Sequence, residues 1–330
     1  TCSVLNDKTI KCWGDNSNGQ LGDGSTTDSF SPISINLGGG DLALSISSGS
    51  YHTCSLTTSR DVKCWGDNYH GQLGMGDNVD RLVPNLVNLP SNASVISISS
   101  GSFHTCAALN NGEVYCWGFN AYGQLGDFST NNSNSPVKAR LLENQIPTQV
   151  SSGVFHTCSL LDGGEIACWG DNTVGQLGDG TFTSSNIPII ADTPVDSAAL
   201  SISVGQRHSC SILDDATLYC WGFNEFGQLG DGTTDNRNSP QEIDLMHGSA
   251  SQIKCSAGTY QPDASQTSCI LADRGYSVPS EGALDQTGCS RGYYSNLRGQ
   301  ATCFEASLGY YVDELLATSQ KACPANTSTV

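Results

Sequence analysis

Histidine and cysteine stand two positions apart in a triplet that returns along the chain, a combination able to bind metal ions. The four histidines concerned are His52, His104, His156 and His208. Imidazole and thiolate are ligands for zinc, and an imidazole can also act as a general acid or base. A residue that returns once in every structural unit, however, usually serves the packing of that unit. We therefore expect these histidines to be structural, with metal binding or catalysis as the alternative.

Aspartate and asparagine form a second recurring motif, Asp-Asn-x-x-Gly, whose oxygens suggest calcium. It occurs at residues 15–19 and 67–71, and Asp23, Asp179 and Asp231 follow such turns. The motif lacks the bidentate Glu at the twelfth position of an EF-hand loop. Asn and Asp also favour turns because their side chains hydrogen-bond the local backbone. Turn formation is the preferred interpretation, and calcium at these turns is the alternative.

Sequence motifs of the common catalytic sites are missing from the chain. We find no G-x-S-x-G, no H-E-x-x-H and no G-x-x-x-x-G-K-[ST]. The carboxylate pair Asp214-Asp215 falls in a predicted hairpin turn. The sequence therefore favours a protein that is not an enzyme and that carries no cofactor.

The elements that would have to position these side chains repeat with a period of 52 residues. The period is marked by Trp13, Trp65, Trp117, Trp169 and Trp221. Each Trp-Gly leads into a Gly- and Asn-rich run, and a segment such as residues 95–106 alternates apolar and small polar side chains, which is typical of a half-buried strand. The pattern predicts several short strands per repeat and an all-β fold. We expect the tryptophans to pack between repeats or on a disulfide, with a ligand-stacking surface as the alternative.

Two cysteines ten residues apart accompany each tryptophan. If Cys106 and Cys116 face each other on antiparallel strands, residues 110–112 form a three-residue loop between them. Such a loop places a left-handed residue third, where Gly fits. Gly112 and Gly164 occupy that place in two repeats, and the other three have Lys8, Arg60 and Ala216, so their turns are expected to be strained or of another type.

Opposed residues of an antiparallel pair lie within disulfide range, and a spacing of ten is not that of a zinc site. We predict the bridges Cys2–Cys12, Cys54–Cys64, Cys106–Cys116, Cys158–Cys168 and Cys210–Cys220. Fifteen cysteines with this regular spacing imply an oxidising compartment.

The run CWG-x-N-x-x-GQLGDG, followed by a Pro and then G-x-x-HTC, resembles the repeat of the regulator-of-chromosome-condensation family over roughly residues 1–245. The resemblance implies a β-propeller with one four-stranded blade per repeat and seven blades in the ring. Five copies are present, and Thr1-Cys2 aligns inside a repeat. We therefore expect a fragment whose missing blades and export signal lie before Thr1.

A different repeat follows, in which Gly258, Gly275, Gly292 and Gly309 recur every 17 residues. Cysteines stand at positions 1 and 15 of alternate units, and both are lost together in the units between, to Ala272 and Gln286 and then to Ala306 and Gln320. Joint loss predicts the bridges Cys255–Cys269 and Cys289–Cys303, with the partner of Cys323 beyond Val330, although other connectivities are open. The segment resembles the ephrin-receptor-like cysteine-rich repeats of extracellular proteins, which implies a stalk. We divide the chain into a propeller at 1–247, a linker at 248–254 and the cysteine-rich module at 255–330.

Charge and modification signals complete the sequence-based interpretation. A net charge of −18 without a basic cluster argues against nucleic-acid binding. No apolar run is long enough to span a bilayer, so a surface anchor would lie outside this chain. Asn92, Asn131 and Asn326 satisfy the glycosylation sequon.

We expect a secreted or cell-surface, non-catalytic binding protein. Its propeller would present variable loops, such as residues 128–136 and 181–187, to a protein or glycan. The resemblance also implies two alternatives, a nucleotide exchange factor for a small GTPase and a secreted enzyme inhibitor. A hydrolase or lyase would require carboxylates clustered at the centre of the ring.

Overall fold

The chain forms two compact units, and they are described separately. The computed structural model describes residues 1–90, 94–194, 197–244, 257, 259–260, 270–274, 276–279, 285–291, 293–298, 300–307 and 310–322. Contacts between residues divide the chain into Thr1–Asp244 and Leu245–Val330. All regular elements among these described residues are strands, as the alternating sequence pattern predicts.

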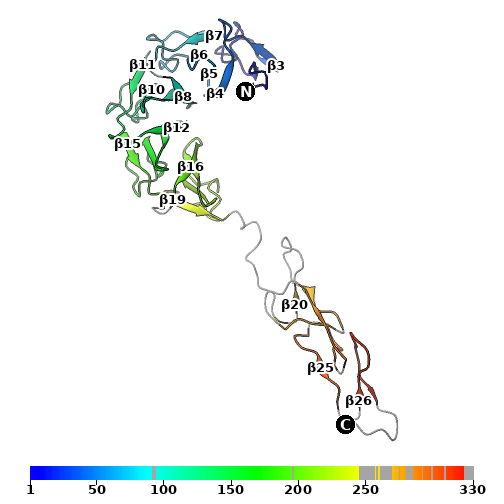
Figure 1. Cartoon of the computed structure of the whole chain (residues 1–330). Coiled ribbons are helices and arrows are strands. Elements are labelled where there is room, and N and C mark those ends of the chain that lie inside the picture. The colour runs from blue at the N-terminus through cyan, green and yellow to red at the C-terminus, as the bar shows by residue number, and fades with distance from the viewer. Residues whose placement is uncertain are drawn as a thin grey trace. The chain divides into compact units, whose positions relative to one another are not determined.

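The first unit consists of five antiparallel sheets, one for each repeat. The first sheet has the strands β1 (Cys2–Val4), β2 (Ile10–Gly14) and β3 (Ser29–Ile35). The next two sheets have β4 (Ala43–Ser48), β5 (His52–Thr57), β6 (Val62–Gly66) and β7 (Arg81–Leu86), and then β8 (Val95–Ser100), β9 (His104–Leu109), β10 (Val114–Gly118) and β11 (Ser133–Lys138). The last two have β12 (Pro147–Ser152), β13 (His156–Leu161), β14 (Ile166–Gly170) and β15 (Ser185–Ile190), and then β16 (Ala199–Val204), β17 (His208–Leu213), β18 (Leu218–Gly222) and β19 (Arg237–Ile243). The sheets follow one another along an arc, with β8, β12 and β16 on its inner side (Figure 1).

The middle hairpin of each blade has the register that the cysteine spacing predicts. Cys106 lies opposite Cys116, and the structure joins the two as a disulfide with 4.1 Å between their Cα atoms. The same bond is present in the other four blades. Each turn places its third residue in the left-handed region, with φ of 84° at Gly112 but also 65° at Arg60. The turns without glycine therefore keep the same conformation and bear its strain, as do Lys8 and Ala216.

The outermost strand of each blade is protected against pairing with another chain. Each such strand contains a proline at the same place in the repeat: Pro32, Pro84, Pro136, Pro188 and Pro240. Proline has no amide hydrogen to donate and is found on edge strands for that reason. The variable segments at 128–136 and 181–187 were expected to be loops, but β11 begins at Ser133 and β15 at Ser185. The loop prediction was therefore wrong for residues 133–136 and 185–187. An edge strand pairs on one side only, so its sequence need not show the alternation that identifies a strand.

Neighbouring blades share a core built around the tryptophans. Trp117 of the third blade is fully buried against the disulfide Cys54–Cys64 of the second, together with Leu56 and Leu73. Trp65, Trp169 and Trp221 pack in the same way on the blade that precedes each of them. Each tryptophan therefore packs between blades and on a disulfide at the same time, because the disulfide of one blade lies under the tryptophan of the next.

The second unit is a series of two-stranded hairpins that advance by 17 residues. They pair β20 (Thr259–Tyr260) with β21 (Ile270–Leu271), β22 (Tyr276–Ser277) with β23 (Thr287–Gly288), β24 (Tyr293–Tyr294) with β25 (Phe304–Glu305), and β26 (Tyr310–Tyr311) with β27 (Lys321–Ala322). The structure joins Cys289 to Cys303. Cys255, Cys269 and Cys323 lie outside the described residues.

The units that lack cysteines are closed by glutamine. The side-chain oxygen Oε1 of Gln286 accepts a hydrogen bond of 2.6 Å from the backbone amide of Asp273. Oε1 of Gln320 accepts the equivalent bond from the backbone amide of Ser307. The separation along the chain is 13 residues in both cases. A side-chain hydrogen bond thus stands where the neighbouring unit has a covalent bridge.

Candidate binding surface

The repeated histidines lie at the junctions between blades. His52 is buried, and its Nε2 is 2.9 Å from the hydroxyl of Thr105 in the following blade. That hydroxyl donates to the Gln72 carbonyl at 2.9 Å, so it can only accept from the histidine. The Nε2 atom of His52 therefore carries a proton. His104 and His156 make the same contact with Thr157 and Ser209.

Burial keeps these rings uncharged. Desolvation lowers the pKa of His52 to about 4, and it lowers the pKa of His104 and His156 to about 3, with smaller effects of the neighbouring histidines and, for His156, of Arg207. His208, in the last blade and only half-buried, has a pKa lowered by desolvation as well. The Nε2 of the buried His52 ring is hydrogen-bonded to Thr105, and Gly49 packs so closely on its other edge that a Cβ atom there would lie 2.6 Å from Nδ1. Such a ring is not placed for proton transfer with a ligand.

One glutamine carbonyl per junction receives two donors from the next blade. The Gln72 oxygen accepts from Trp117 Nε1 at 2.8 Å in addition to Thr105. Two residues further along, Gly74 has a φ of +72°, and a Cβ atom there would lie 2.8 Å from the Trp117 indole nitrogen. The G-Q-L-G motif therefore binds and packs against the tryptophan of the following blade. Trp13 is half-buried on the first blade.

The asparagine of each Asp-Asn-x-x-Gly motif holds its own loop together. The side-chain nitrogen Nδ2 of Asn16 donates to Asp23 Oδ1 and to the backbone carbonyls of Ser25 and Thr27, at 3.1 to 3.2 Å. The side-chain oxygen Oδ1 of Asn16 accepts a hydrogen bond from the backbone amide of Leu21 at 2.9 Å. The oxygens that would have to ligate calcium thus surround a protein donor. Within the described ranges, no three His, Cys, Asp or Glu side chains come together as a metal-binding group.

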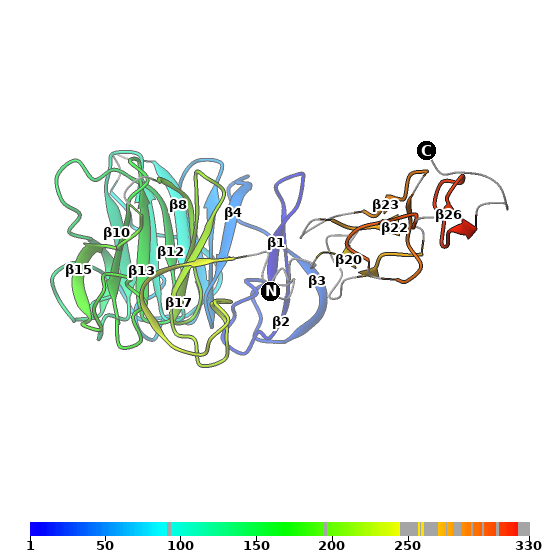
Figure 2. The ribbon, with the colours of Figure 1, turned by 90° about the horizontal axis from the view of Figure 1, so that it is seen from below.

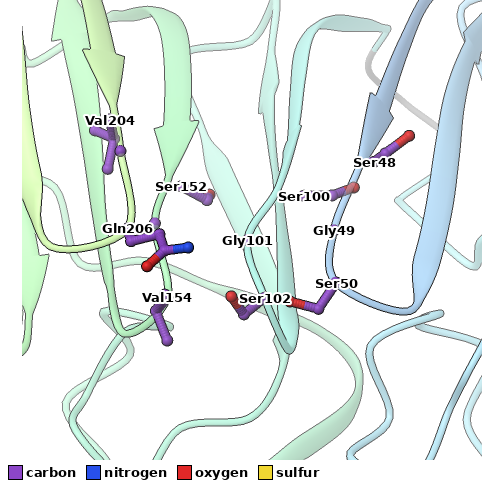
Figure 3. Close-up of a pocket in the computed structure, with 12 residues that line it drawn as sticks. Ser48, Gly49, Ser50, Ser100, Gly101, Ser102, Ser152, Val154, Val204 and Gln206 are labelled. Atoms are coloured by element: carbon purple, nitrogen blue, oxygen red, sulfur yellow. The ribbon is translucent and has the colours of Figure 1, made fainter. Parts of the chain in front are cut away.

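A shallow groove of about 280 Å³ runs along the inner wall of the arc (Figure 3). Ser48, Ser100 and Ser152, from successive blades, line it together with glycines and Gln206. Serines of the same strands join the blades, since the Ser47 hydroxyl accepts from the Ser100 amide at 2.8 Å. The lining has hydroxyl and amide groups but no acid or base, so it offers no partner that could activate a serine nucleophile.

Aromatic side chains instead gather on one face of the propeller. The loop rim comprises the residue before each repeated histidine and the four residues after each Trp-Gly; in blades two to five these are Tyr51, Phe103, Phe155, Arg207 and residues 67–70, 119–122, 171–174 and 223–226. The two parts of the rim are held together in every case by a backbone bond, such as that from the Phe119 amide to the Phe103 carbonyl at 2.9 Å. Seen from the side, the strands run between two opposite sets of loops (Figure 2), and the rim belongs to one of them.

Seven rings of the loop rim form one connected aromatic cluster across three blades. Its members are Tyr51, Tyr69, His70, Phe103, Phe119, Tyr122 and Phe155. The centroid of His70 in the second blade lies 4.9 Å from that of Phe119 in the third, and Tyr122 lies 4.7 Å from Phe155 of the fourth. Tyr69 is 76% exposed, and Tyr51 and Tyr122 are each 42% exposed. Sequence reasoning missed this cluster, although the change from Asp67 to Phe119 and Phe223 after Trp-Gly was a signal.

The remaining predicted residues are placed as follows. Asn131 is exposed on the way from β10 to β11, whereas Asn92 and Asn326 lie outside the described residues. No helix in the described part of the chain has the length and apolar character needed to cross a membrane.

The repeated antiparallel sheets, with their shared tryptophan junctions, define an all-β protein of the propeller class. The RCC1-like domain matches residues 1–261. The chain belongs to the RCC1-like domain family.

Relatives in sequence have various activities. The chain is 32% identical over 283 residues to the ultraviolet-B receptor UVR8 of Arabidopsis thaliana, covering 86% of this chain and 64% of that protein. It is 29% identical over 244 residues to the human E3 ubiquitin-protein ligase HERC2, covering 73% of this chain and 5% of the relative. The chain thus spans less than two thirds of the length of these relatives.

Solved structures share the fold at lower identity. Human WBSCR16 has a TM-score of 0.66 at 21% identity, covering 73% of this chain and 64% of that one. Yeast RCC1 (Prp20), crystallised with Kap60, has a TM-score of 0.65 at 20% identity, covering 74% of this chain and 58% of that one. At these identities the similarity supports the fold alone.

Proposed function

We propose that this chain is a non-catalytic binding protein of the extracellular space or the cell surface, whose loop rim contacts a protein or glycan partner. The observation that carries the proposal is the aromatic cluster. Exposed rings gathered over three blades bury large apolar areas on binding, and aromatic residues are enriched at the energetic centres of interfaces. The blades beneath, joined by buried hydrogen bonds, supply the rigid frame.

The internal repeat provides a comparison for the role of these rings. The position of Phe119 is occupied by Asp67 and Asp171 in neighbouring blades, and that of Phe103 by Arg207. The backbone bond of the rim is 2.8 to 2.9 Å in all four blades. The fold therefore does not require an aromatic side chain at either position, which supports a role in recognition.

The cysteines support the proposed location. A disulfide in every blade is typical of proteins that fold in an oxidising compartment. The hairpins of the second unit are small, and three of them have a closure of their own, by Gln286, by Cys289–Cys303 or by Gln320. This arrangement suits a stalk, and the resemblance of the segment to ephrin-receptor-like repeats supports the same role.

The test has two parts, both on the full chain exported to an oxidising compartment. Peptide mapping without reduction should recover the Cys54–Cys64 peptide pair and its four counterparts. Labelled protein should then bind cells or an oligosaccharide array, and the double variant F103R/F119D should lose this binding. The control Phe30→Asn removes an exposed ring outside the cluster and installs the residue that Asn134 and Asn186 hold in other repeats.

Two results would contradict the proposal. Free thiols in all blades would argue against the extracellular location and favour nucleotide exchange on a small GTPase, which release of labelled GDP would measure. Equal binding by F103R/F119D and Phe30→Asn would show that the rim is not the contact surface.

A further inference from the structure

The charges around the aromatic cluster are unbalanced. Across blades one to five, the four residues after each Trp-Gly include the carboxylates Asp15, Asp67, Asp171 and Glu225 and no Lys or Arg. Arg207 is the single guanidinium of the loop rim, all of whose residues the structure describes. Hydrogen bonds from Ser17 and Gln20 lower the pKa of the Asp15 carboxyl. Asp171 is buried and paired with Arg207, so the negative charge that the rim presents comes from Asp15, Asp67 and Glu225.

Arg207 shows how a cation is received on this surface. Its guanidinium carbon lies 5.5 Å from the centroid of Phe223. One of its nitrogens donates to the Thr173 hydroxyl at 3.0 Å and lies 3.8 Å from the buried carboxylate of Asp171. An aromatic face and a carboxylate therefore bind one guanidinium together between the fourth and fifth blades.

The same pair of residue types recurs between the second and third blades, where the rim has no Arg or Lys. Asp67 has the place of Asp171, and Phe119 has the place of Phe223. The position equivalent to Arg207 is taken by Phe103, whose ring lies 6.4 Å from Phe119 and 5.6 Å from His70. Several rings thus meet at the place of the guanidinium, and Asp67 holds the repeat position of the carboxylate, without an Arg of the chain's own between them.

Resting on the proposed function, we infer that the partner of the loop rim is a basic protein segment whose Arg or Lys side chains stack on the aromatic cluster. Three properties of the molecule support this choice. The rings offer faces for cations, the nearby carboxylates offer charge, and the whole chain carries a net charge of −18, which attracts a basic partner over a longer range. A glycan would use the rings but would gain nothing from the negative charge.

The experiment measures binding of the disulfide-bonded full chain to a synthetic peptide in which Arg alternates with Gly and Ser. Matched peptides replace every Arg with Gln or with Glu, and fluorescence anisotropy gives the dissociation constants. We expect the Arg peptide to bind at least about tenfold more tightly than the Gln peptide, because each cation on an aromatic face contributes roughly two- to thirtyfold. Raising the salt concentration should weaken this binding.

Substitutions taken from the chain's own repeats test the surface. Phe103→Arg installs the residue of the fifth blade and should weaken binding of the Arg peptide by about tenfold or more, since it removes a ring and adds a like charge. Phe119→Asp removes a ring but adds a carboxylate, so a loss of affinity here would show that the rings themselves hold the cation. Phe30→Asn should leave the dissociation constant unchanged.

The outcomes separate this inference from the proposed function. Equal affinity for the Arg, Gln and Glu peptides, or equal affinity of Phe103→Arg and Phe30→Asn for the Arg peptide, would overturn the basic partner. If an oligosaccharide or an acidic protein is bound by the native chain and lost in Phe103→Arg, the rim is a binding surface but the inferred partner is wrong. If no ligand distinguishes Phe103→Arg from Phe30→Asn, both proposals fall.

Discussion

Acid should destabilise the propeller well above the pH at which its carboxylates are protonated. His52, His104 and His156 are neutral in the folded chain, with pKa values of about 4, 3 and 3. An unfolded histidine has a pKa near 6.5, so between pH 6.5 and 4 the unfolded state binds protons that the folded state does not. The free energy of unfolding must therefore fall as the pH is lowered through this window.

The magnitude follows from the same linkage. Moving from pH 8 to pH 5 should lower the free energy of unfolding by about 2 kcal/mol for each buried histidine, or by about 6 kcal/mol for the three. Carboxylates whose folded pKa is lowered, such as Asp231 at about 2, add their loss mainly below about pH 4, where unfolded carboxylates take up protons. The midpoint of urea unfolding at pH 8 and pH 5 measures the difference.

Two variants isolate the histidine contribution. His104→Gln keeps an amide donor near the Thr157 hydroxyl and removes the titrating ring, so the loss between pH 8 and pH 5 should shrink by about 2 kcal/mol. Thr157→Val removes the same hydrogen bond but keeps the ring, and should lower stability by about 1–3 kcal/mol at both pH values. An unchanged pH dependence in His104→Gln, or an imidazole signal of His104 that titrates near pH 6.5, would refute the reasoning.

Three further predictions concern single positions. Gly74→Ala should lower the free energy of unfolding in urea by about 2–5 kcal/mol, because the new Cβ atom would meet Trp117 and the φ is left-handed. Gly112→Ala has open space around the new atom and should lower it by only about 1–2 kcal/mol. Equal losses would show that the indole moves to make room. Arg60→Gly should raise the free energy of unfolding by up to about 1 kcal/mol by relieving a φ of 65°, and a melting temperature below that of the native chain would contradict this. Gln286→Ala should speed hydrogen exchange of the Asp273 amide roughly two- to tenfold, since the bond contributes about 0.5–1.5 kcal/mol; unchanged exchange would count against it.

The sequence predicts what lies within one repeat far better than what lies between repeats. The spacing of Cys106 and Cys116 places the hairpin, its register and the left-handed third residue of its turn, because these depend on residues that are close along the chain. The carbonyl that receives the Trp117 nitrogen belongs to Gln72, 45 residues earlier. Nothing in the local pattern selects that atom, since blade stacking brings it into place.

Sequence reasoning missed the candidate surface for a related reason. Phe103 and Phe119 are 16 positions apart, and both contact His70 of another blade. Variability between repeats pointed to residues 128–136, whereas Phe103 and Phe119 stand at positions that vary only between aromatic residues and Arg or Asp. The closing role of Gln286 was also missed, because the sequence shows that two cysteines are lost together but not that a side chain takes over their bond.

The junctions between blades have a consequence for how such a gene can change length. The junctions use partners that are 33, 45 or 53 residues apart, with equivalent atoms from one junction to the next. A recombination event that duplicates or deletes 52 residues would therefore join two surfaces that already fit each other. Because each disulfide closes within one repeat, the event would also leave no unpaired thiol. Gaining or losing a blade is in this sense a single genetic step that requires no compensating substitution at the new junction.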